Sequence, residues 1–324
     1  MTASGHHASG RGSLRAYGAL VVAVLGITWS AIFVRWAGVP GPASAFYRVF
    51  IAALVLWPWR AVRALNARSD DEPRARQDPR AIWLALAGGA FFGLDLALYN
   101  TAVLMTTAST ATLLGNNAPI FVGIGSWLFF GRRPARRFWV GLGLALLGGA
   151  LVVVTAIAGE GAGNVRGDLL ALSASTFFAA YMLTTERVRA GMDTLTFSSI
   201  SAAGTVATLL VTCLVFGSAL SGYSPRAWAA LLGLGLISQL TAYFALAYAL
   251  GHLPATITSV GLLAQVPLTA SLAVPLLGER LTGAQMVGGL LVLAGIYVVN
   301  QPSTSLQDQE IRRTMNAPDL RVSC

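Results

Sequence analysis

The sequence contains no lysine, since every one of its 22 basic residues is arginine. This absence excludes two kinds of site. A Walker A phosphate-binding loop requires a lysine, and enzymes that use pyridoxal phosphate hold that cofactor on a lysine Schiff base. Neither site can be built from this chain.

Charged residues are also scarce, at 11% of the 324 residues, whereas a soluble globular domain carries about 25%. Hydrophobic residues make up 55% of the chain, and the mean hydropathy is +0.66. So few charges cannot cover a surface that faces water. The composition therefore predicts a membrane protein that crosses the bilayer several times.

Cysteine and histidine are too few and too scattered for a metal site. Cys213 lies in an apolar run and Cys324 is the last residue, so neither a metal-binding spacing nor a disulfide is expected. His6 and His7 lie in a polar N-terminal stretch and His252 lies beside an expected turn, positions typical of solvated or interfacial side chains. We predict no catalytic residue, no metal and no cofactor.

Ten apolar stretches are long enough for helices that cross a bilayer, which need about 20 mostly apolar residues. Barrel strands would alternate in polarity and be about half as long. We therefore predict an all-α membrane protein with ten transmembrane helices. The stretches cover residues 17–37, 43–62, 81–104, 108–130, 138–158, 167–185, 194–216, 227–250, 255–277 and 284–300.

Arginines in the connecting segments predict how these helices are oriented. If the N-terminus is cytoplasmic, seventeen arginines fall on the cytoplasmic side, four on the outer side, and Arg48 within the second stretch. Basic loop residues favour the cytoplasmic side. We thus predict a multi-pass protein of the plasma (inner) membrane with cytoplasmic tails at 1–16 and 301–324. The net charge of +9 then reflects topology, and nucleic acid is not an expected partner.

The chain contains an internal repeat. Residues 129–153 (FFGRRPARRFWVGLGLALLGGALVV) align with residues 276–300 (LLGERLTGAQMVGGLLVLAGIYVVN) at a shift of 147 positions. We divide the chain into a first repeat at 17–158 and a second at 167–300. This shift pairs glycines, and a shift of one more position pairs prolines and amides: Gly141 with Gly288, Gly148 with Gly295, Pro119 with Pro267, and Asn117 with Gln265.

Five helices per repeat is an odd number, so the two copies are expected to enter the membrane from opposite sides. Their loops agree, because RRPARR in the first copy corresponds to ERLTG in the second, which has one arginine and one glutamate. Inverted repeats of this kind place a binding site at their interface near the bilayer midplane. Rocking of one half against the other then alternates access to that site.

The same residues carry a resemblance to a known family. The segment LGERLTGAQMVGGLLVLAGIYVV, preceded by AYFALAYALGHLPATITSVGLLAQVPLTASLAVPLL, resembles the second EamA repeat of the drug/metabolite transporter superfamily. GITWSAIFVRWAGVPGPASAFYRVFIAALVL resembles the start of the first repeat. The resemblance covers residues 15–300 and implies ten helices, cytoplasmic termini and export of small metabolites, often amino acids, as in YddG-like exporters. One position departs from it, because Arg132 stands where the family's repeats usually carry the glutamate seen at Glu279.

Two ionisable residues lie inside predicted helices. At 1.5 Å per residue, Arg48 is about 8 Å and Asp95 about 13 Å from the outer ends of their helices, so their side chains can meet. In one interpretation they form an ion pair that holds the second and third helices together. In the other, one or both face a cavity and bind a zwitterion or a proton. Asp95 is then the candidate for proton coupling.

The fourth and ninth helices carry matching polar residues next to prolines. Asn116, Asn117 and Pro119 lie in the fourth, and Gln265 and Pro267 lie in the ninth. A proline interrupts the helical hydrogen bonds and frees a carbonyl, so we expect a helix break at each proline. The amides either line a substrate cavity, which we favour because the repeat places them at matching depth, or form hydrogen bonds between helices.

Five further polar and aromatic residues complete the predicted substrate cavity. Tyr99 lies one turn after Asp95 on the same helix face, and Asn100 follows Tyr99. Gln239 and Tyr243 have the same spacing in the eighth helix, and Trp29 lies in the first. Aromatic rings there suit apolar or aromatic substrates. A membrane tyrosine or tryptophan is otherwise a packing residue or an interfacial anchor.

Glycines are concentrated in the fifth and tenth helices. GLGLALLGG at 141–149 superficially resembles a dinucleotide-binding loop, but it lies inside an apolar stretch and no polar helix follows it. Small residues instead permit close approach of helices. Gly288, Gly289 and Gly295 repeat the pattern, so we predict tight packing or homodimer formation through these two helices.

We therefore predict a secondary transporter that exports small metabolites, most directly amino acids, from the cytoplasm by alternating access. The sequence has no nucleotide-binding domain, so a substrate or ion gradient is expected to drive it. An uncoupled facilitator of other small metabolites or drugs is the alternative. An enzyme would need catalytic groups such as HExxH or a lysine, which the sequence lacks, and a non-transporting scaffold or receptor would not need an inverted repeat. The expected partners are a small-molecule substrate and the lipid bilayer.

Overall fold

The computed structural model describes residues 6–66, 78–105, 114–157, 165–277 and 283–301. These residues form helices and contain no strand, which confirms the predicted all-α class. Each of the ten predicted ranges contains helix. The elements are α1 (His6–Thr28), α2 (Ser30–Ala37), α3 (Gly41–Leu65), α4 (Pro79–Met105), α6 (Ala118–Phe130), α7 (Arg136–Ile157), α8 (Val165–Arg189), α9 (Thr194–Val215), α10 (Pro225–Gly233), η1 (Leu234–Thr241), α11 (Ala242–Leu250), α12 (Ala255–Gly261), η2 (Leu262–Ala264), α13 (Gln265–Leu277) and α14 (Gly283–Asn300).

Several of these segments are long and apolar enough to cross a membrane. Within the described residues six qualify: Ser13–Ala37, Gly41–Leu65, Pro79–Ala102, Val165–Arg189, Thr194–Val215 and Pro225–Leu250. Shorter apolar helices at Ala118–Phe130, Ala255–Thr269 and Met286–Asn300 fall in the predicted fourth, ninth and tenth ranges. The structure therefore describes a membrane protein with several spanning helices.

The first predicted helix is longer than expected and is divided at Trp29. Helix α1 begins at His6, well before the expected start at residue 17. A helix can begin in a polar segment that precedes the apolar run. The Thr28 hydroxyl donates to the Val24 carbonyl at 2.7 Å, a local bond that often accompanies a bend. Helix α2 follows and ends at Gly38, whose φ of 58° is left-handed and suits glycine.

The eighth predicted helix contains a π-helical segment, η1, between α10 and α11. Its wider turn is visible in a side-chain contact, because the Thr241 hydroxyl donates to the carbonyl of Leu236, five residues earlier, at 2.9 Å. Short π segments inside α-helices often occur at functional sites. This segment carries Gln239.

Helix geometry is also interrupted beside both predicted prolines. Residues 116–117 form a turn, and α6 starts directly after it with Pro119 in its first turn, where a missing N–H costs nothing. In the ninth range, the 3₁₀ segment η2 separates α12 from α13, and Pro267 lies in the first turn of α13. The two interruptions therefore occupy corresponding places in the two halves of the chain.

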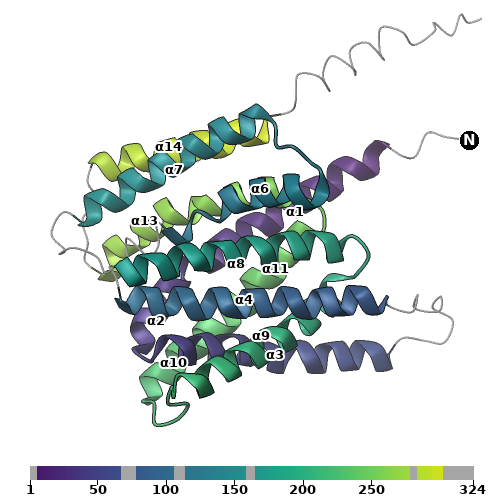
Figure 1. Cartoon of the computed structure of the whole chain (residues 1–324), viewed down its shortest axis with the longest axis vertical. Coiled ribbons are helices and arrows are strands. Elements are labelled where there is room, and N and C mark those ends of the chain that lie inside the picture. Colours follow the sequence, from purple (N-terminus) through teal and green to yellow (C-terminus); the bar gives the residue numbers. More distant parts are fainter. Residues whose placement is uncertain (1–5, 67–77, 106–113, 158–164, 278–282, 302–324) are drawn as a thin grey trace, which may run out of the picture.

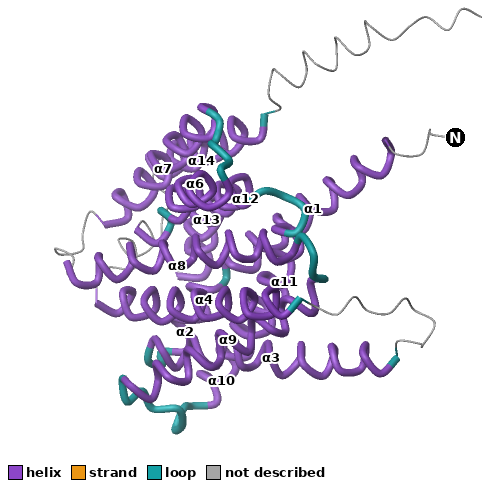
Figure 2. The backbone as a smooth tube through the Cα atoms, turned by 45° about the vertical axis from the view of Figure 1, so that its right-hand side comes forward, coloured by secondary structure: helices purple, strands orange, loops and turns teal. Residues whose placement is uncertain are grey.

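The helices pack side by side, with their long axes running across the view in Figure 1. The most extensive contacts join α7 with α14, α4 with α8 and α9, α3 with α9, and α1 with α11. Helices α7 and α14 form a pair at one edge of the molecule in Figures 1 and 2. Helix α4 lies in the middle, so its side chains can reach both α8 and α9.

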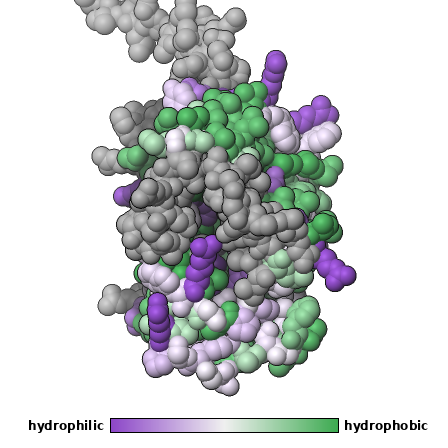
Figure 3. Space-filling view, turned by 90° about the vertical axis from the view of Figure 1, so that its left-hand side faces the viewer, coloured by the Kyte–Doolittle hydropathy of each residue, from purple (hydrophilic) through white to green (hydrophobic). Residues whose placement is uncertain are grey.

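Large apolar side chains remain exposed on the outer faces of the helices. Leu210, Val211, Leu214 and Val215 on α9 are examples, as are Leu290 and Leu293 on α14. Figure 3 views the molecule from one end of the helices, with hydrophobic residues gathered over the upper part and along one flank. Exposed apolar faces of this size favour contact with lipid over contact with water.

The α7–α14 contact depends on glycine. A Cβ atom on Gly141 would lie 2.6 Å from the Gly295 carbonyl oxygen, and one on Gly148 would lie 2.5 Å from the Gly288 carbonyl oxygen. These are backbone contacts within one chain, so the glycines provide the tight packing that the sequence predicted. Homodimer formation would have to use other residues of these helices, and it stays a prediction.

We expect Gly148→Ala to destabilise the protein by about 1–3 kcal/mol, since the added methyl group forces two backbones apart. Gly149→Ala is the matched control, because a Cβ at this neighbouring glycine meets nothing within 4 Å and alanine favours helix by about 1 kcal/mol. Thermal unfolding of purified protein in detergent measures both. Equal melting temperatures for the two variants would show that the contact contributes nothing.

Candidate functional site

A small cavity lies among α3, α4, α8, α9, η1 and α11. Its volume is about 30 Å³, room for about two water molecules at most, so the cavity in this structure is smaller than an amino acid. One wall is aromatic and consists of Phe92, Tyr181, Tyr243 and Phe244. Another wall carries hydroxyl groups and consists of Ser198, Ser201 and Thr205.

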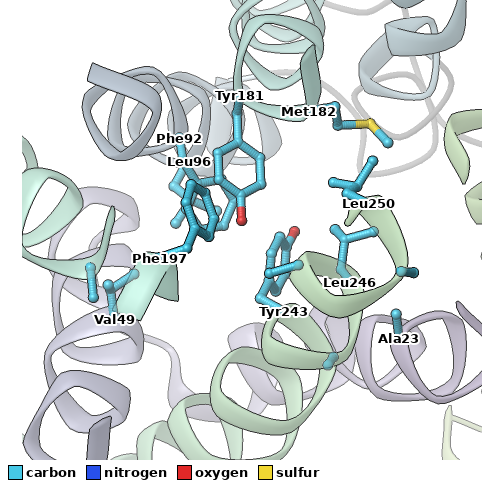
Figure 4. Close-up of a cluster of buried hydrophobic side chains, with 14 of the residues drawn as sticks. Ala23, Val49, Phe92, Leu96, Tyr181, Met182, Phe197, Tyr243, Leu246 and Leu250 are labelled. Carbon is cyan, nitrogen blue, oxygen red and sulfur yellow. The ribbon is translucent and has the colours of Figure 1, made fainter. Parts of the chain in front are cut away.

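The aromatic wall is a stack centred on Phe92 of α4. Its ring centroid lies 4.7 Å from that of Tyr181 and 4.6 Å from that of Tyr243. Figure 4 shows the hydroxyl ends of the two tyrosines pointing toward one another beside Phe92. Stacked and tilted rings at these separations attract each other, so the wall has a defined shape and presents two polar ends.

The hydroxyl wall lies along α9. Thr205 donates to the Gly89 carbonyl at 2.8 Å and is also 2.9 Å from the carbonyl of Ser201, one turn earlier. The Ser198 hydroxyl is buried and has no hydrogen-bond partner among the described residues. The wall thus holds both satisfied and unsatisfied hydroxyl groups.

Arg48 of α3 is 4% exposed and lies beside this cavity. Its Nε donates to Gln239 Oε1 at 2.6 Å, and its Nη1 donates to Ser30 Oγ at 3.1 Å. The guanidinium carbon lies 5.1 Å from the ring centroid of Tyr243, a cation–π contact. Nη2 is buried and has no hydrogen-bond partner among the described residues. Gln239 and Tyr243, which the sequence predicted for the cavity, therefore position the guanidinium.

Asp95 of α4 is 9% exposed, and the charge of Arg48 acts on it. The two residues do not form a direct ion pair: neither of the ion pairs between described residues joins them. The described residues also give the Asp95 carboxylate no hydrogen bond. The structure thus brings the two ionisable groups to one region without the contact that a fixed pair would need.

Trp29 lies next to this site rather than in the cavity wall. Its ring is half-buried and lies 5.9 Å from that of Phe33, while its neighbour Ser30 accepts the hydrogen bond from Arg48. The division between α1 and α2 places this serine toward α3.

The amides beside the two helix interruptions contact each other. Gln265 Nε2 donates to Asn116 Oδ1 at 3.0 Å, which joins the start of α13 to the turn before α6. Asn117 donates from its side chain to the Leu114 carbonyl at 3.0 Å, within its own turn. Pro267 packs close to Gly289 of α14. None of these residues lines the cavity described above.

Asn100 and Tyr99 contribute to helix packing. The buried Asn100 amide donates to the Gly41 carbonyl at 3.2 Å and to Ser44 Oγ at 3.1 Å, which joins the end of α4 to the start of α3. A Cβ atom on Gly115 would lie 3.0 Å from the Tyr99 ring, so this ring covers Gly115. Neither side chain lines the cavity described above.

Arg132, which departs from the family resemblance, has a partner of its own. It forms an ion pair with Glu186 of α8 at 2.8 Å, and the other carboxylate oxygen of Glu186 accepts a hydrogen bond from the backbone N–H of Ala255 at 3.1 Å. Glu186 thereby joins the loop before α7 to the start of α12. Glu279 lies outside the described residues.

Sequence reasoning missed several residues of the site. Ser30, Ser198, Phe92 and Tyr181 were not singled out, because a hydroxyl or a ring in an apolar helix is commonly a packing residue. One signal was available: Ser201 and Thr205 are four residues apart in the otherwise apolar α9, so they share a face. Among the described residues, no group of three or more His, Cys, Asp and Glu side chains could hold a metal ion.

We expect Asn100→Ala to lower stability by about 1–2 kcal/mol, because it removes two buried hydrogen bonds worth about 0.5–1.5 kcal/mol each. Ser44→Ala removes the bond from Asn100 and the bond that the Ser44 hydroxyl donates to the Gly41 carbonyl, so it should lower stability by a similar amount. Melting temperatures in detergent and substrate affinity after reconstitution are the measurements. A variant at Asn100 that melts like the wild type but binds substrate differently would instead place this amide in the binding site.

Known proteins resemble this chain over most of its length. The uncharacterized transporter YwfM of Bacillus subtilis is 33% identical over 210 residues, covering 63% of this chain and 68% of that protein. A probable terminal-alkyne amino-acid exporter of Streptantibioticus cattleyicolor is 28% identical over 295 residues, covering 89% of this chain and 94% of that protein. A solved crystal structure superposes with a TM-score of 0.71 at 18% identity, over 90% of this chain and 97% of that one, and so shares the fold. The EamA-like transporter family matches residues 14–154 and 165–301, and the chain belongs to that family of membrane transporters.

Proposed function

We propose that the protein is a secondary transporter that exports small metabolites, with amino acids as the leading substrate class, by alternating access. The observation that carries this proposal is the central cavity, which lies between α3 and α4 of the first half and α8, α9, η1 and α11 of the second. The buried Arg48 and Asp95 lie beside it. Ionisable residues inside membrane helices commonly mark a substrate or ion pathway.

The amino-acid substrate is supported by one relative. The Streptantibioticus cattleyicolor protein carries the name of a probable amino-acid exporter and aligns with nearly the whole of this chain. A transporter for such a solute must remove a charged head group from water, and this requires polar or charged partners in the site. The cavity and the residues next to it provide both kinds of partner.

Two inverted repeats are supported by contacts that occur in matched pairs. If a two-fold axis relates the repeats, a contact between two residues implies a contact between their counterparts. Gly141 lies against Gly295, and their counterparts at the shift of 147 are Gly288 and Gly148, which also lie against each other. The family match likewise falls on two segments, 14–154 and 165–301.

Whole helices follow the same pairing. The contact of α4 with α8 joins the third helix to the sixth, and its expected counterpart joins the eighth to the first, which is the contact of α11 with α1. The contact of α4 with α9 has its counterpart in that of η1 with α3. An interface built in this way can rock without either half changing shape.

The proposed orientation has both termini in the cytoplasm of the plasma (inner) membrane. In Figure 1 the start of α1, the end of α3 and the start of α4 all lie at the same end of the molecule. The arginine-rich segment from 60 to 80 connects those two helices, so the positive charge gathers on one side. That side faces the cytoplasm by the usual distribution of basic loop residues.

Counterflow in proteoliposomes tests the function directly. Vesicles loaded with a mixture of unlabelled amino acids should accumulate the matching labelled amino acid from outside, at a rate well above that of protein-free vesicles. Counterflow requires no ion gradient, so a coupled exporter and an uncoupled facilitator would both accumulate the labelled amino acid. Absence of exchange for every amino acid, with folded protein in the membrane, would remove amino acids as the substrate.

Ala52→Phe should reduce this exchange at least tenfold, because Ala52 lines the small cavity and a phenyl ring would fill it. Ala61→Phe is the control, since it makes the same change at an exposed position of the same helix. Initial rates per folded protein compare the two. If the rates of both variants equal that of the wild type, substrate does not pass through this cavity.

A further inference from the structure

We propose that Arg48 and Asp95 are the two ends of a receptor for the zwitterionic head of an amino acid, with the substrate side chain directed into the aromatic cavity. This inference rests on the proposed function, because it assumes that amino acids enter the central site. The guanidinium of Arg48 takes the substrate carboxylate, and the carboxylate of Asp95 takes the substrate ammonium group. The recognition is noncovalent.

Arg48 and Asp95 lie at the same level of the bundle, one helical turn from the cavity. Ala52 lines the cavity and follows Arg48 by four residues, while Phe92 lines it and precedes Asp95 by three. Residues three and four apart share a helix face. Helices α3 and α4 run in opposite directions (Figure 1). The move from Arg48 forward to Ala52 and the move from Asp95 back to Phe92 therefore lead toward the same end of the molecule.

Arg48 has one nitrogen left for a ligand. Gln239 and Ser30 hold Nε and Nη1, and the Tyr243 ring lies against the guanidinium, so its plane is fixed. The Tyr243 hydroxyl also lies close to the guanidinium. Nη2 remains buried without a partner among the described residues. A preoriented arginine N–H group is a strong donor to a carboxylate oxygen.

Asp95 supplies the opposite charge. Its carboxylate is buried, and the described residues give it neither an ion pair nor a hydrogen bond. A buried ion without a partner is costly, so this position favours an occupant with a positive charge. The charges of both Arg48 and Asp95 act on the Tyr243 hydroxyl, so this residue lies near both groups.

A direct ion pair between these residues would have satisfied both groups in the absence of substrate. The structure instead keeps them in one region but apart. Two opposite charges that flank one region match a ligand with adjacent opposite charges, and an α-amino acid has them one carbon apart. A simple anion or a simple cation would satisfy one end and leave the other unpaired.

The cavity defines which amino acids fit. Its lining includes aromatic, aliphatic and hydroxyl side chains, with Gln239 as its one amide, and no charged side chain. Charged substrate side chains would lose their hydration there without gaining a partner. The receptor therefore selects zwitterions with apolar or aromatic side chains.

Analogues that lack one charge test this inference on the wild-type protein. We would titrate purified protein in detergent with L-phenylalanine, 3-phenylpropanoate and 2-phenylethylamine, and with L-leucine, 4-methylpentanoate and 3-methylbutylamine. We expect at least one amino acid to bind at least tenfold more tightly than both of its analogues. Equal binding within both sets, or no binding of either amino acid, would overturn the receptor. Counterflow of other amino acids would in that case still support the transporter.

Variants assign the two ends. Arg48→Gln should abolish the preference for L-phenylalanine over 2-phenylethylamine, and Asp95→Asn should abolish the preference over 3-phenylpropanoate. Arg35→Gln, at an exposed arginine of α2, should keep both preferences. A uniform loss of affinity for all three ligands in either variant would indicate a structural role and overturn the assignment. If Arg48→Gln does not fold, the wild-type analogue series still decides whether both charges of the ligand are recognised.

Discussion

The contacts around Arg48 are the interaction on which the centre of this structure depends. A guanidinium inside a membrane helix bundle must be solvated by protein groups, because lipid supplies none. Ser30 from α2 and Gln239 from η1 provide hydrogen bonds, and Tyr243 from α11 provides a ring face. These segments come from both halves of the chain. One buried charge therefore ties α2, α3 and the eighth helix together beside the cavity.

The rest of the interface divides into two kinds of contact. At one edge, glycines bring the backbones of α7 and α14 into direct contact, and apolar side chains such as Leu142 and Val292 pack around these points. Elsewhere the halves meet through polar groups, such as the amide pair of Asn116 and Gln265 and the exposed ion pair of Arg132 with Glu186. Polar contacts can exchange partners with water or substrate at small cost, whereas close-packed glycines cannot. The architecture therefore combines close glycine packing at one edge with polar contacts elsewhere between the halves.

The sequence predicted helix content well and side-chain partners less well, for a physical reason. Apolar length locates a helix and the depth of a residue along it, and this sufficed to place Gln239 and Tyr243 at the cavity. Depth does not reveal which way a side chain points around the helix axis. The sequence left open whether Arg48 and Asp95 form an ion pair or face a cavity; no direct ion pair forms between them, and Asn100 joins two helices. Ser30 escaped notice because the division of the first helix at Trp29, which turns it toward α3, has no strong sequence signal.

The π-helical segment η1 sets the direction of the side chains in the eighth helix. Its backbone turns are wider than those of the α-helical segments on either side, as the reach from Thr241 back to Leu236 shows. A wider turn changes the angle about the helix axis at which the residues after it point. Gln239 lies on this segment. A continuous α-helix through α10 and α11 would place that amide at a different angle, so the wider turn is part of what directs Gln239 at the guanidinium.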